Sequence, residues 1–195
     1  MDHSEKELKN KSQSKRSRKN FEKTSLKPAN FQAKKIFEKI KKNKGLTTND
    51  LMRFLKGAKN FLGVFPSDQI PKIRDSPIPL FFIVNIDNSS QPGSHWIGFR
   101  LNYFSLEIYD SLGFNPSRWN KFPPDILKFF LRYRLTHKFS AIPKLQAENT
   151  FNCGLFCVYF VLARGKKSLD QCLFKFSNNL DNNQSVLYRE INLFF

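Results

Sequence analysis

The pattern of apolar and polar positions divides the chain into a polar N-terminal segment and a longer, element-rich region. Residues 1–29 contain almost no apolar side chains, which predicts disorder in isolation. Apolar residues recur between Phe31 and Lys44 at spacings that permit a basic amphipathic helix, formed on contact with a partner or with the domain. A clearer helix, capped by Thr47 or Thr48, is predicted from Asn49 to about Lys59.

The middle of the chain predicts a loop followed by three strands. Residues 61–71 contain a glycine and two prolines among aromatic residues, so we expect an ordered loop there. The run from Leu80 to Ile86 is continuously apolar, as expected of a strand that is buried on both faces. His95–Leu101 and Leu106–Tyr109 flank a short turn, which predicts an antiparallel hairpin.

The remaining chain predicts four helices and one more strand. We expect a helix from Pro123 or Pro124 to about Arg134, with Ile126, Leu127, Phe130 and Leu131 facing inward, and a short strand over 139–142. Three helices follow, at 153–163, 169–176 and about 183–193. This order predicts an α+β domain with a central, mostly antiparallel or mixed sheet flanked by helices.

The length and charge of the chain predict a basic N-terminal arm followed by one folded domain. A chain of 195 residues fits one domain, here residues 46–195, preceded by a basic arm over residues 1–45. The net charge is +17, and the arm alone holds 15 Lys and Arg against 5 Asp and Glu. Such an excess indicates a polyanionic partner, and nucleic acid is the expected one. The candidate contact residues are Lys15, Arg16, Arg18 and Lys19, a cluster that fits a nuclear import signal equally well.

The cysteine count and the hydropathy of the chain indicate in which cellular compartment the protein is expected. Three cysteines do not form a disulfide framework, and they favour a reducing compartment such as cytosol or nucleus. Neither a membrane-spanning run nor an apolar signal segment is found in the sequence, so we expect a protein that is neither secreted nor membrane-bound. The sequence does not predict a metal site, and we expect a monomer.

One stretch, Gln146–Phe160, suggests nucleophilic chemistry. A polar loop leads through Asn152-Cys153-Gly154 into a dense apolar run, which predicts a cysteine in the first turn of a buried helix. The unpaired N–H groups and the dipole at a helix start favour thiolate over thiol, which makes Cys153 a candidate nucleophile. The alternative is that Cys153 and Cys157, four residues apart, are both buried core residues.

Hairpin geometry supplies a base and an acid for this cysteine. His95 begins one strand and Asp110 follows its partner, so the two side chains should lie close together. An imidazole oriented by a carboxylate is the arrangement that removes a thiol proton. Gln146, on the loop before Cys153, is a candidate donor to an oxyanion alongside the Cys153 N–H. Each residue also has a plain alternative: a strand-edge histidine, a turn aspartate and a surface glutamine.

These residues carry a resemblance to a known family. The chain resembles the adenovirus-type cysteine proteases (adenain), which belong to the same clan as the SUMO-deconjugating proteases; residues 63–71 are also similar to a loop of related transposon (polinton) proteases. The similarity covers about Leu46 to Ala163, and its motifs are Gly93–Phe99, Tyr109–Phe114, Gln146 and Asn152–Cys157. It implies an adenain-like fold, with Cys153 as nucleophile, His95 as base, Asp110 as its orienting acid and Gln146 as oxyanion donor.

The resemblance also implies substrates and partners. We expect a cysteine endopeptidase that matures viral or transposon capsid or core precursors in the virion and the host nucleus or cytoplasm, with Trp96 flanking a cleft suited to small residues such as Gly. No cofactor should be required, although DNA is a candidate activator. An activating peptide is a candidate partner, but a disulfide to a cysteine before Gln146 is not expected because no cysteine precedes Cys153. The family acid is Glu in adenovirus enzymes and Asp in the deconjugating branch.

Two other functions stay open at this point. One is a ubiquitin-like or SUMO-type deconjugating protease, which would need a surface for a folded modifier. The other is a DNA-binding structural protein with an inactive protease fold, for which the basic arm would serve equally well.

Overall fold

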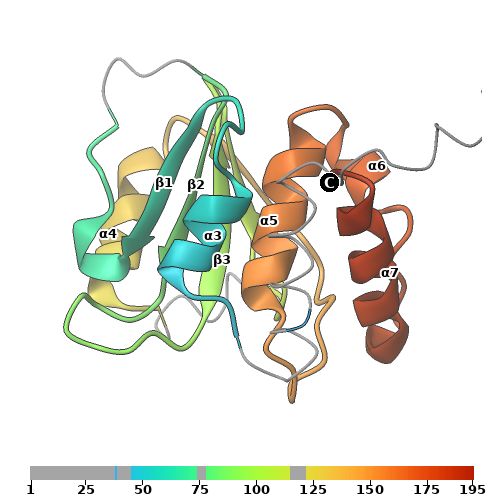
Figure 1. Cartoon of the computed structure of the whole chain (residues 1–195). Coiled ribbons are helices and arrows are strands. Elements are labelled where there is room, and N and C mark those ends of the chain that lie inside the picture. The colour runs from blue at the N-terminus through green and yellow to red at the C-terminus, as the bar shows by residue number, and fades with distance from the viewer. Residues whose placement is uncertain (1–37, 39–44, 74–77, 115–121) are drawn as a thin grey trace, which may run out of the picture.

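A five-stranded mixed sheet forms the centre of the domain. The computed structural model describes residue 38 and residues 45–73, 78–114 and 122–195. The strand order is β1-β2-β3-β4-β5, with the antiparallel pairs in the middle and a parallel pair at each edge. The predicted α+β class is therefore confirmed (Figure 1). The strands are β1 (Phe61–Pro66), β2 (Leu80–Asn85), β3 (Trp96–Leu101), β4 (Ser105–Tyr109) and β5 (Lys138–Ala141).

Helices cover both faces of this sheet (Figure 1). On one face lie α3 (Thr48–Phe54), α5 (Cys153–Arg164) and α7 (Leu180–Asn192), with α6 (Leu169–Leu173) beside α5; on the other lies α4 (Pro124–Tyr133). Strand β2 serves both cores, since Phe81 and Ile83 pack toward α5 while Phe82 and Val84 pack toward α4. This two-sided burial explains its continuous apolar run.

The prediction of a loop over residues 61–71 was wrong. Phe61–Pro66 forms strand β1, which pairs in parallel with β2, and a short 3-10 helix, η1 (Ser67–Gln69), follows. Gly63 has φ of 145° beside an irregularity in the register, and Pro66 ends the strand. Both residues are tolerated because β1 lies at the edge of the sheet, where one side of the backbone is unpaired.

Other boundaries also differ from the sequence expectation. The first described helix ends at Phe54 rather than Lys59, because the chain turns through left-handed conformations at Gly57 and Asn60. Thr47 caps it, as predicted. In α4, Leu131 is exposed and Leu127 half-buried, while Phe129 is buried in their place. The arm and the helix expected between Phe31 and Lys44 lie outside the described residues, Glu38 excepted, so the division at residue 45 stays a prediction.

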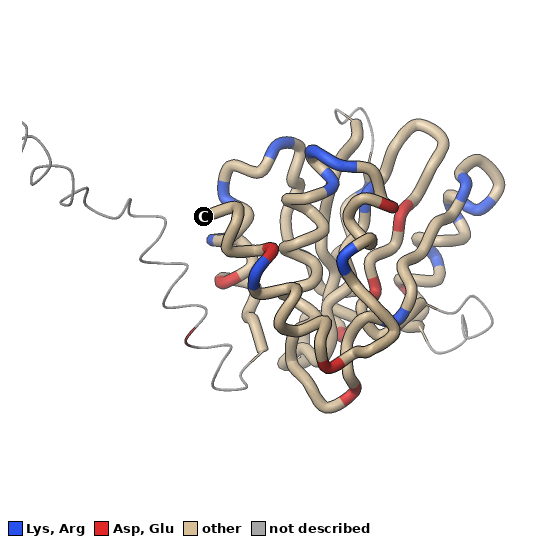
Figure 2. Tube along the Cα trace, turned by 90° about the vertical axis from the view of Figure 1, so that its right-hand side faces the viewer, with Lys and Arg blue, Asp and Glu red and all other residues tan. Residues whose placement is uncertain are grey.

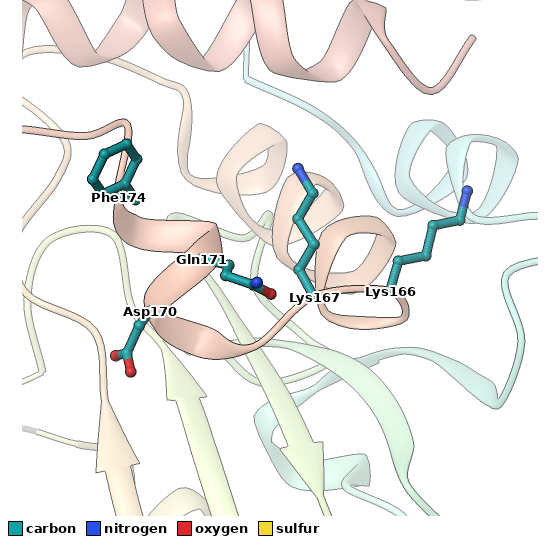
Figure 3. Close-up of a pocket in the computed structure, with 5 residues that line it drawn as sticks. All are labelled: Lys166, Lys167, Asp170, Gln171 and Phe174. Atoms are coloured by element: carbon teal, nitrogen blue, oxygen red, sulfur yellow. The ribbon is translucent and has the colours of Figure 1, made fainter.

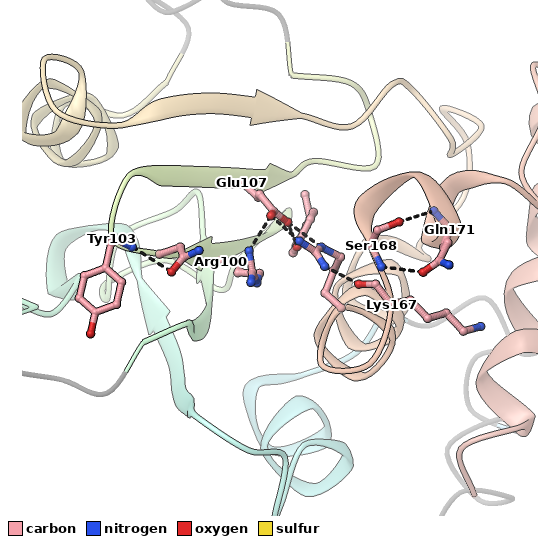
Figure 4. A network of polar contacts seen from close by, with 9 residues as sticks. Arg100, Tyr103, Glu107, Lys167, Ser168 and Gln171 are labelled. Carbon is pink, nitrogen blue, oxygen red and sulfur yellow. Dashed lines mark hydrogen bonds and ion pairs between the residues drawn. The ribbon is translucent and has the colours of Figure 1, made fainter.

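A buried charge network joins the end of α5 to β4 (Figure 4). The Glu107 carboxylate accepts hydrogen bonds from Arg100 at 2.7 Å, from Arg164 Nε at 2.8 Å and from the Tyr109 hydroxyl at 2.5 Å. The arginines hold the pKa of Glu107 below its usual value even though burial acts to raise it. Removing one partner of such a buried set typically costs about 3–5 kcal/mol. The network therefore fixes the helix that begins at Cys153 against the strand that leads to Asp110.

Candidate active site

Cys153 is the first residue of α5, and 7% of its surface is exposed. Asn152 precedes the helix but its side chain does not cap it, so the first backbone N–H groups have no side-chain partner there. These N–H groups and the helix dipole create a site that favours negative charge. The predicted placement of the cysteine at a helix start is confirmed.

His95 and Asp110 meet in the way that the hairpin predicted. His95 directly precedes β3 and Asp110 directly follows β4, and the two strands pair in antiparallel register. His95 Nε2 lies 2.8 Å from Asp110 Oδ1. In this contact Nε2 donates and the carboxylate oxygen accepts, so the second ring nitrogen, Nδ1, takes no part in the bond to Asp110.

The surroundings of His95 stabilise its protonated form. Burial acts to lower the pKa of the imidazole, but the hydrogen bond to Asp110 and the interactions with the Cys153 side chain outweigh it and raise the pKa to about 9. A histidine with this pKa is mostly protonated at neutral pH. The imidazolium therefore lies beside both the Asp110 carboxylate and the Cys153 side chain.

Gln146 is a buried residue held from two sides, with 3% of its surface exposed. Its Oε1 accepts a hydrogen bond from Ser111 Oγ at 2.7 Å, and its Nε2 donates to the Thr150 carbonyl at 2.6 Å. The Gln146 backbone N–H also donates to the Ser111 carbonyl at 2.9 Å. The second Nε2 hydrogen of Gln146 makes no hydrogen bond within the described residues. The burial of Gln146 excludes the surface-loop alternative.

Ser111 was missed by sequence reasoning, although it holds Gln146 in place. It is buried and follows Asp110 directly, so one turn orients both the acid and the amide. The only sequence signal was the turn-like run Asp110-Ser111-Leu112-Gly113, in which a serine is an ordinary turn residue.

Trp96 is wedged between the start of α5 and Leu46. Its indole N–H donates to the Leu46 carbonyl at 2.9 Å. A Cβ added at Gly154 would lie 3.1 Å from the Trp96 ring and 3.1 Å from Leu46 Cβ, so a larger residue beside Cys153 would require these neighbours to move. Leu46, a second residue not foreseen, thus positions Trp96. The substrate contact expected of Trp96 stays a prediction.

The other two cysteines lie in the core. Cys157 is buried one turn beyond Cys153, its Sγ donates to the Trp96 carbonyl at 3.5 Å, and burial raises the pKa of its thiol well above the usual value. Burial also raises the pKa of Cys172, to about 11. Both thiols are poor nucleophiles at neutral pH.

The candidate nucleic-acid contacts Lys15, Arg16, Arg18 and Lys19 lie outside the described residues. Within residues 45–73, 78–114 and 122–195, we find no group of three metal-ligating side chains. In the same part of the chain, every helix is too short or too polar to span a membrane.

Comparisons with known proteins add a family match. Residues 61–186 match the family model described as adenovirus endoprotease. Among solved structures, the SUMO protease Ulp1 with its catalytic cysteine oxidised to a sulfinic acid is 13% identical over 80% of this chain and 81% of that chain, with a TM-score of 0.41. A protease of ASFV is 17% identical over 76% of this chain and 68% of that chain, with a TM-score of 0.44. A search of curated proteins gives no match.

Proposed function

This chain belongs to the adenovirus endoprotease family and is a cysteine peptidase, and we propose that Cys153, His95 and Asp110 are its catalytic triad, with Gln146 as oxyanion donor. The observation that carries this proposal is the 2.8 Å contact between His95 Nε2 and Asp110 Oδ1. It leaves the other ring nitrogen for Cys153, which begins a helix. An inactive protease fold would have no need of this set of aligned groups.

The proposed reaction begins with attack on the scissile carbonyl. The Cys153 thiolate forms a bond to the carbonyl carbon, and the developing oxyanion accepts hydrogen bonds from the Cys153 N–H and the free Gln146 Nε2–H. His95, protonated at Nδ1, then gives that proton to the leaving amine nitrogen. The C–N bond breaks and a thioester with Cys153 remains.

Water completes the cycle. His95, now neutral at Nδ1, takes a proton from the attacking water molecule, whose oxygen bonds to the thioester carbon. The C–S bond breaks, the carboxylic acid leaves, and the sulfur again lies beside a protonated imidazole. Asp110 keeps Nε2 protonated throughout and steadies the positive charge on the ring.

The natural substrates that we propose are precursor proteins of a viral or transposon capsid or core. Support comes from the family match and from the half-buried Trp96 beside the nucleophile, whose indole flank suits small residues such as Gly near the cut. The test is cleavage of Gly-containing peptides compared with covalent probes built on folded modifiers. Faster reaction with a modifier probe would contradict the precursor proposal and support a deconjugating enzyme.

We further propose that the enzyme works next to nucleic acid in the virion or the host cell, as a monomer that needs no cofactor for chemistry. The support is the charge of the arm, which contains 15 basic and 5 acidic residues. Neutralising Lys15, Arg16, Arg18 and Lys19 to Gln tests the role of these residues: we expect slower cleavage in the presence of DNA and an unchanged rate without it. Equal rates in both conditions would contradict this part.

A further inference from the structure

Exposed charges are unevenly distributed between the two ends of the sheet, with Lys144 at the acidic end and Asp170 at the basic end as exceptions. The end that carries Cys153 has exposed or half-exposed acidic side chains in its loops and at helix starts: Asp68, Asp87, Glu148 and Asp181. The opposite end, where α3 and α5 end and β4 and β5 begin, is basic: Lys56, Lys59, Arg134, Lys138, Lys166 and Lys167. In Figure 2 the upper end carries mainly blue segments, whereas the lowest loops carry red ones.

Contacts join several of these basic segments into one surface. The Lys138 N–H donates to the Phe104 carbonyl at 2.8 Å, which places the start of β5 beside the tip of the β3–β4 hairpin. From that hairpin, Glu107 bonds to Arg164, and Arg164 in turn donates to the Lys167 carbonyl (Figure 4). We define the distal surface as residues 102–104, Lys138, Lys166, Lys167 and Phe174.

The lysines of the distal surface are not neutralised by neighbours. Lys138 and Lys167 form no ion pair with any residue in the part of the chain that the structure describes, and Lys166 lies over the Phe194 ring at 5.8 Å. The nearby acid Glu107 is buried and already paired with Arg100 and Arg164. Among the residues that line the pocket beside Lys166 and Lys167, Asp170 is the one acidic side chain. The surface therefore keeps a positive potential available to a partner.

Aromatic rings stand exposed among these lysines. Tyr103 is 70% exposed and Phe104 80% exposed, with ring centroids 6.4 Å apart. Phe174 is 88% exposed and lines a pocket of about 540 Å³ together with Lys166, Lys167, Asp170 and Gln171. Figure 3 shows both lysine side chains extending to the same side of the loop between α5 and α6. Exposed aromatic rings next to cations are the elements from which single-strand binding surfaces are made.

We propose that the distal surface binds single-stranded nucleic acid, with the lysines on the phosphates and the exposed rings stacked on unpaired bases. It extends to the folded domain the nucleic-acid association proposed above for the arm, and it adds an orientation. Because the surface lies at the end opposite Cys153, the bound domain presents its active site away from the nucleic acid. A protein substrate carried on the same strand is then reached without displacing the enzyme.

The form of the surface favours nucleic acid over a membrane. A helix or patch that enters a lipid surface needs a continuous apolar face. Here the exposed rings belong to two separate segments, the hairpin tip and the residue that follows α6, with the charged side chains of Lys166 and Lys167 beside the second. Isolated rings flanked by cations suit bases that are spaced along a charged backbone.

The test uses the full chain in which Lys15, Arg16, Arg18 and Lys19 are Gln, so that this arm cluster does not contribute and differences between variants report on the domain. A charge variant carries K138Q, K166Q and K167Q, an aromatic variant carries Y103S, F104S and F174S, and a control carries K128Q and K144Q outside the distal surface. Fluorescence anisotropy measures the affinity for a labelled oligo-dT and for a duplex of the same length at several salt concentrations. Vesicles containing phosphatidylserine are the third probe.

We expect the charge variant to lose about 2 from the slope of log K against log salt, since each phosphate contact to a single strand contributes about 0.7. The aromatic variant should bind oligo-dT about tenfold or more weakly and bind the duplex as before. Equal affinities of the charge variant and the control would overturn the proposal, and so would vesicle binding that depends on these residues without oligo-dT binding. Binding is measured without substrate, so a failure of the proposed peptidase chemistry would show separately, in peptide cleavage.

Discussion

The Ser111 hydroxyl donates to Gln146 Oε1 at 2.7 Å, and Ser111 is the residue that follows Asp110. One turn therefore sets both the carboxylate that orients His95 and the amide that is proposed to bind the oxyanion. We expect Ser111→Ala to lower kcat about tenfold with little change in KM, because the amide loses the bond that fixes its orientation. Steady-state kinetics on a Gly-containing peptide measure this. Ser90→Ala, an exposed serine in a loop, is the matched control and should keep wild-type kinetics.

We expect the Gln146 amide to stabilise the transition state more than the bound substrate, so its loss should lower kcat more than it changes KM. Replacing it with Ala is expected to lower kcat about 100- to 1,000-fold, since one oxyanion donor is lost. Gln146→Glu should be slower still, because it places a carboxylate where negative charge develops. Circular dichroism checks that both variants fold. A folded Gln146→Ala variant with wild-type kcat would show that the amide does not face the reacting carbonyl.

The raised pKa of His95 predicts a pH dependence of stability. The folded pKa of about 9 exceeds the ordinary value of 6.5, so folding stabilises the protonated ring. This contribution, about 3 kcal/mol, is fully present below pH 6.5 and is lost as the pH rises from 6.5 through 9. Urea unfolding at a series of pH values measures it. In Asp110→Asn the loss over this range should be clearly smaller, and an unchanged loss would mean that Asp110 does not hold the imidazolium.

The contact between His95 and Asp110 was predicted from the sequence, whereas the contact between Ser111 and Gln146 was not. The first pair is local, because a short hairpin places the start of one strand opposite the end of the next. The second pair is 35 residues apart and joins a turn to a loop that only the packed domain brings together. Local geometry was predictable from sequence for this reason, and the second contact was not.

Strand β1 was not predicted because it too depends on a contact with a segment distant in the sequence. Residues 61–66 contain a glycine and a proline, which normally indicate a loop. They form β1 because their backbone pairs in parallel with that of β2. Strand β2 itself was predicted because its buried residues on both faces leave a continuous apolar run in the sequence. Helix α3 ends at Phe54 because the chain turns through positive φ at Gly57 and Asn60. The sequence shows the glycine, but it does not show that the chain turns there.

Gly154 should tolerate no side chain. An added Cβ would lie 3.1 Å from both the Trp96 ring and Leu46 Cβ, so Gly154→Ala must displace residues next to Cys153. We expect a loss of about 1–3 kcal/mol in the free energy of unfolding and a lower kcat. Gly165→Ala at the end of the same helix is the control, because its nearest neighbour is a carbonyl oxygen at 3.5 Å. Equal stability of the two variants would contradict the close packing described at Gly154.

The central claim is that Cys153 is the nucleophile and that Cys157 and Cys172 are not. The most direct measurement is alkylation of the full chain with iodoacetamide at graded pH, with the modified cysteine mapped by mass spectrometry and peptide cleavage followed in parallel. We predict that Cys153 is modified first at neutral pH, that activity falls in proportion, and that Cys153→Ala abolishes cleavage while its thermal melt stays near that of the wild type. Preferential labelling of Cys157 or Cys172, or cleavage by the Cys153→Ala variant, would contradict it.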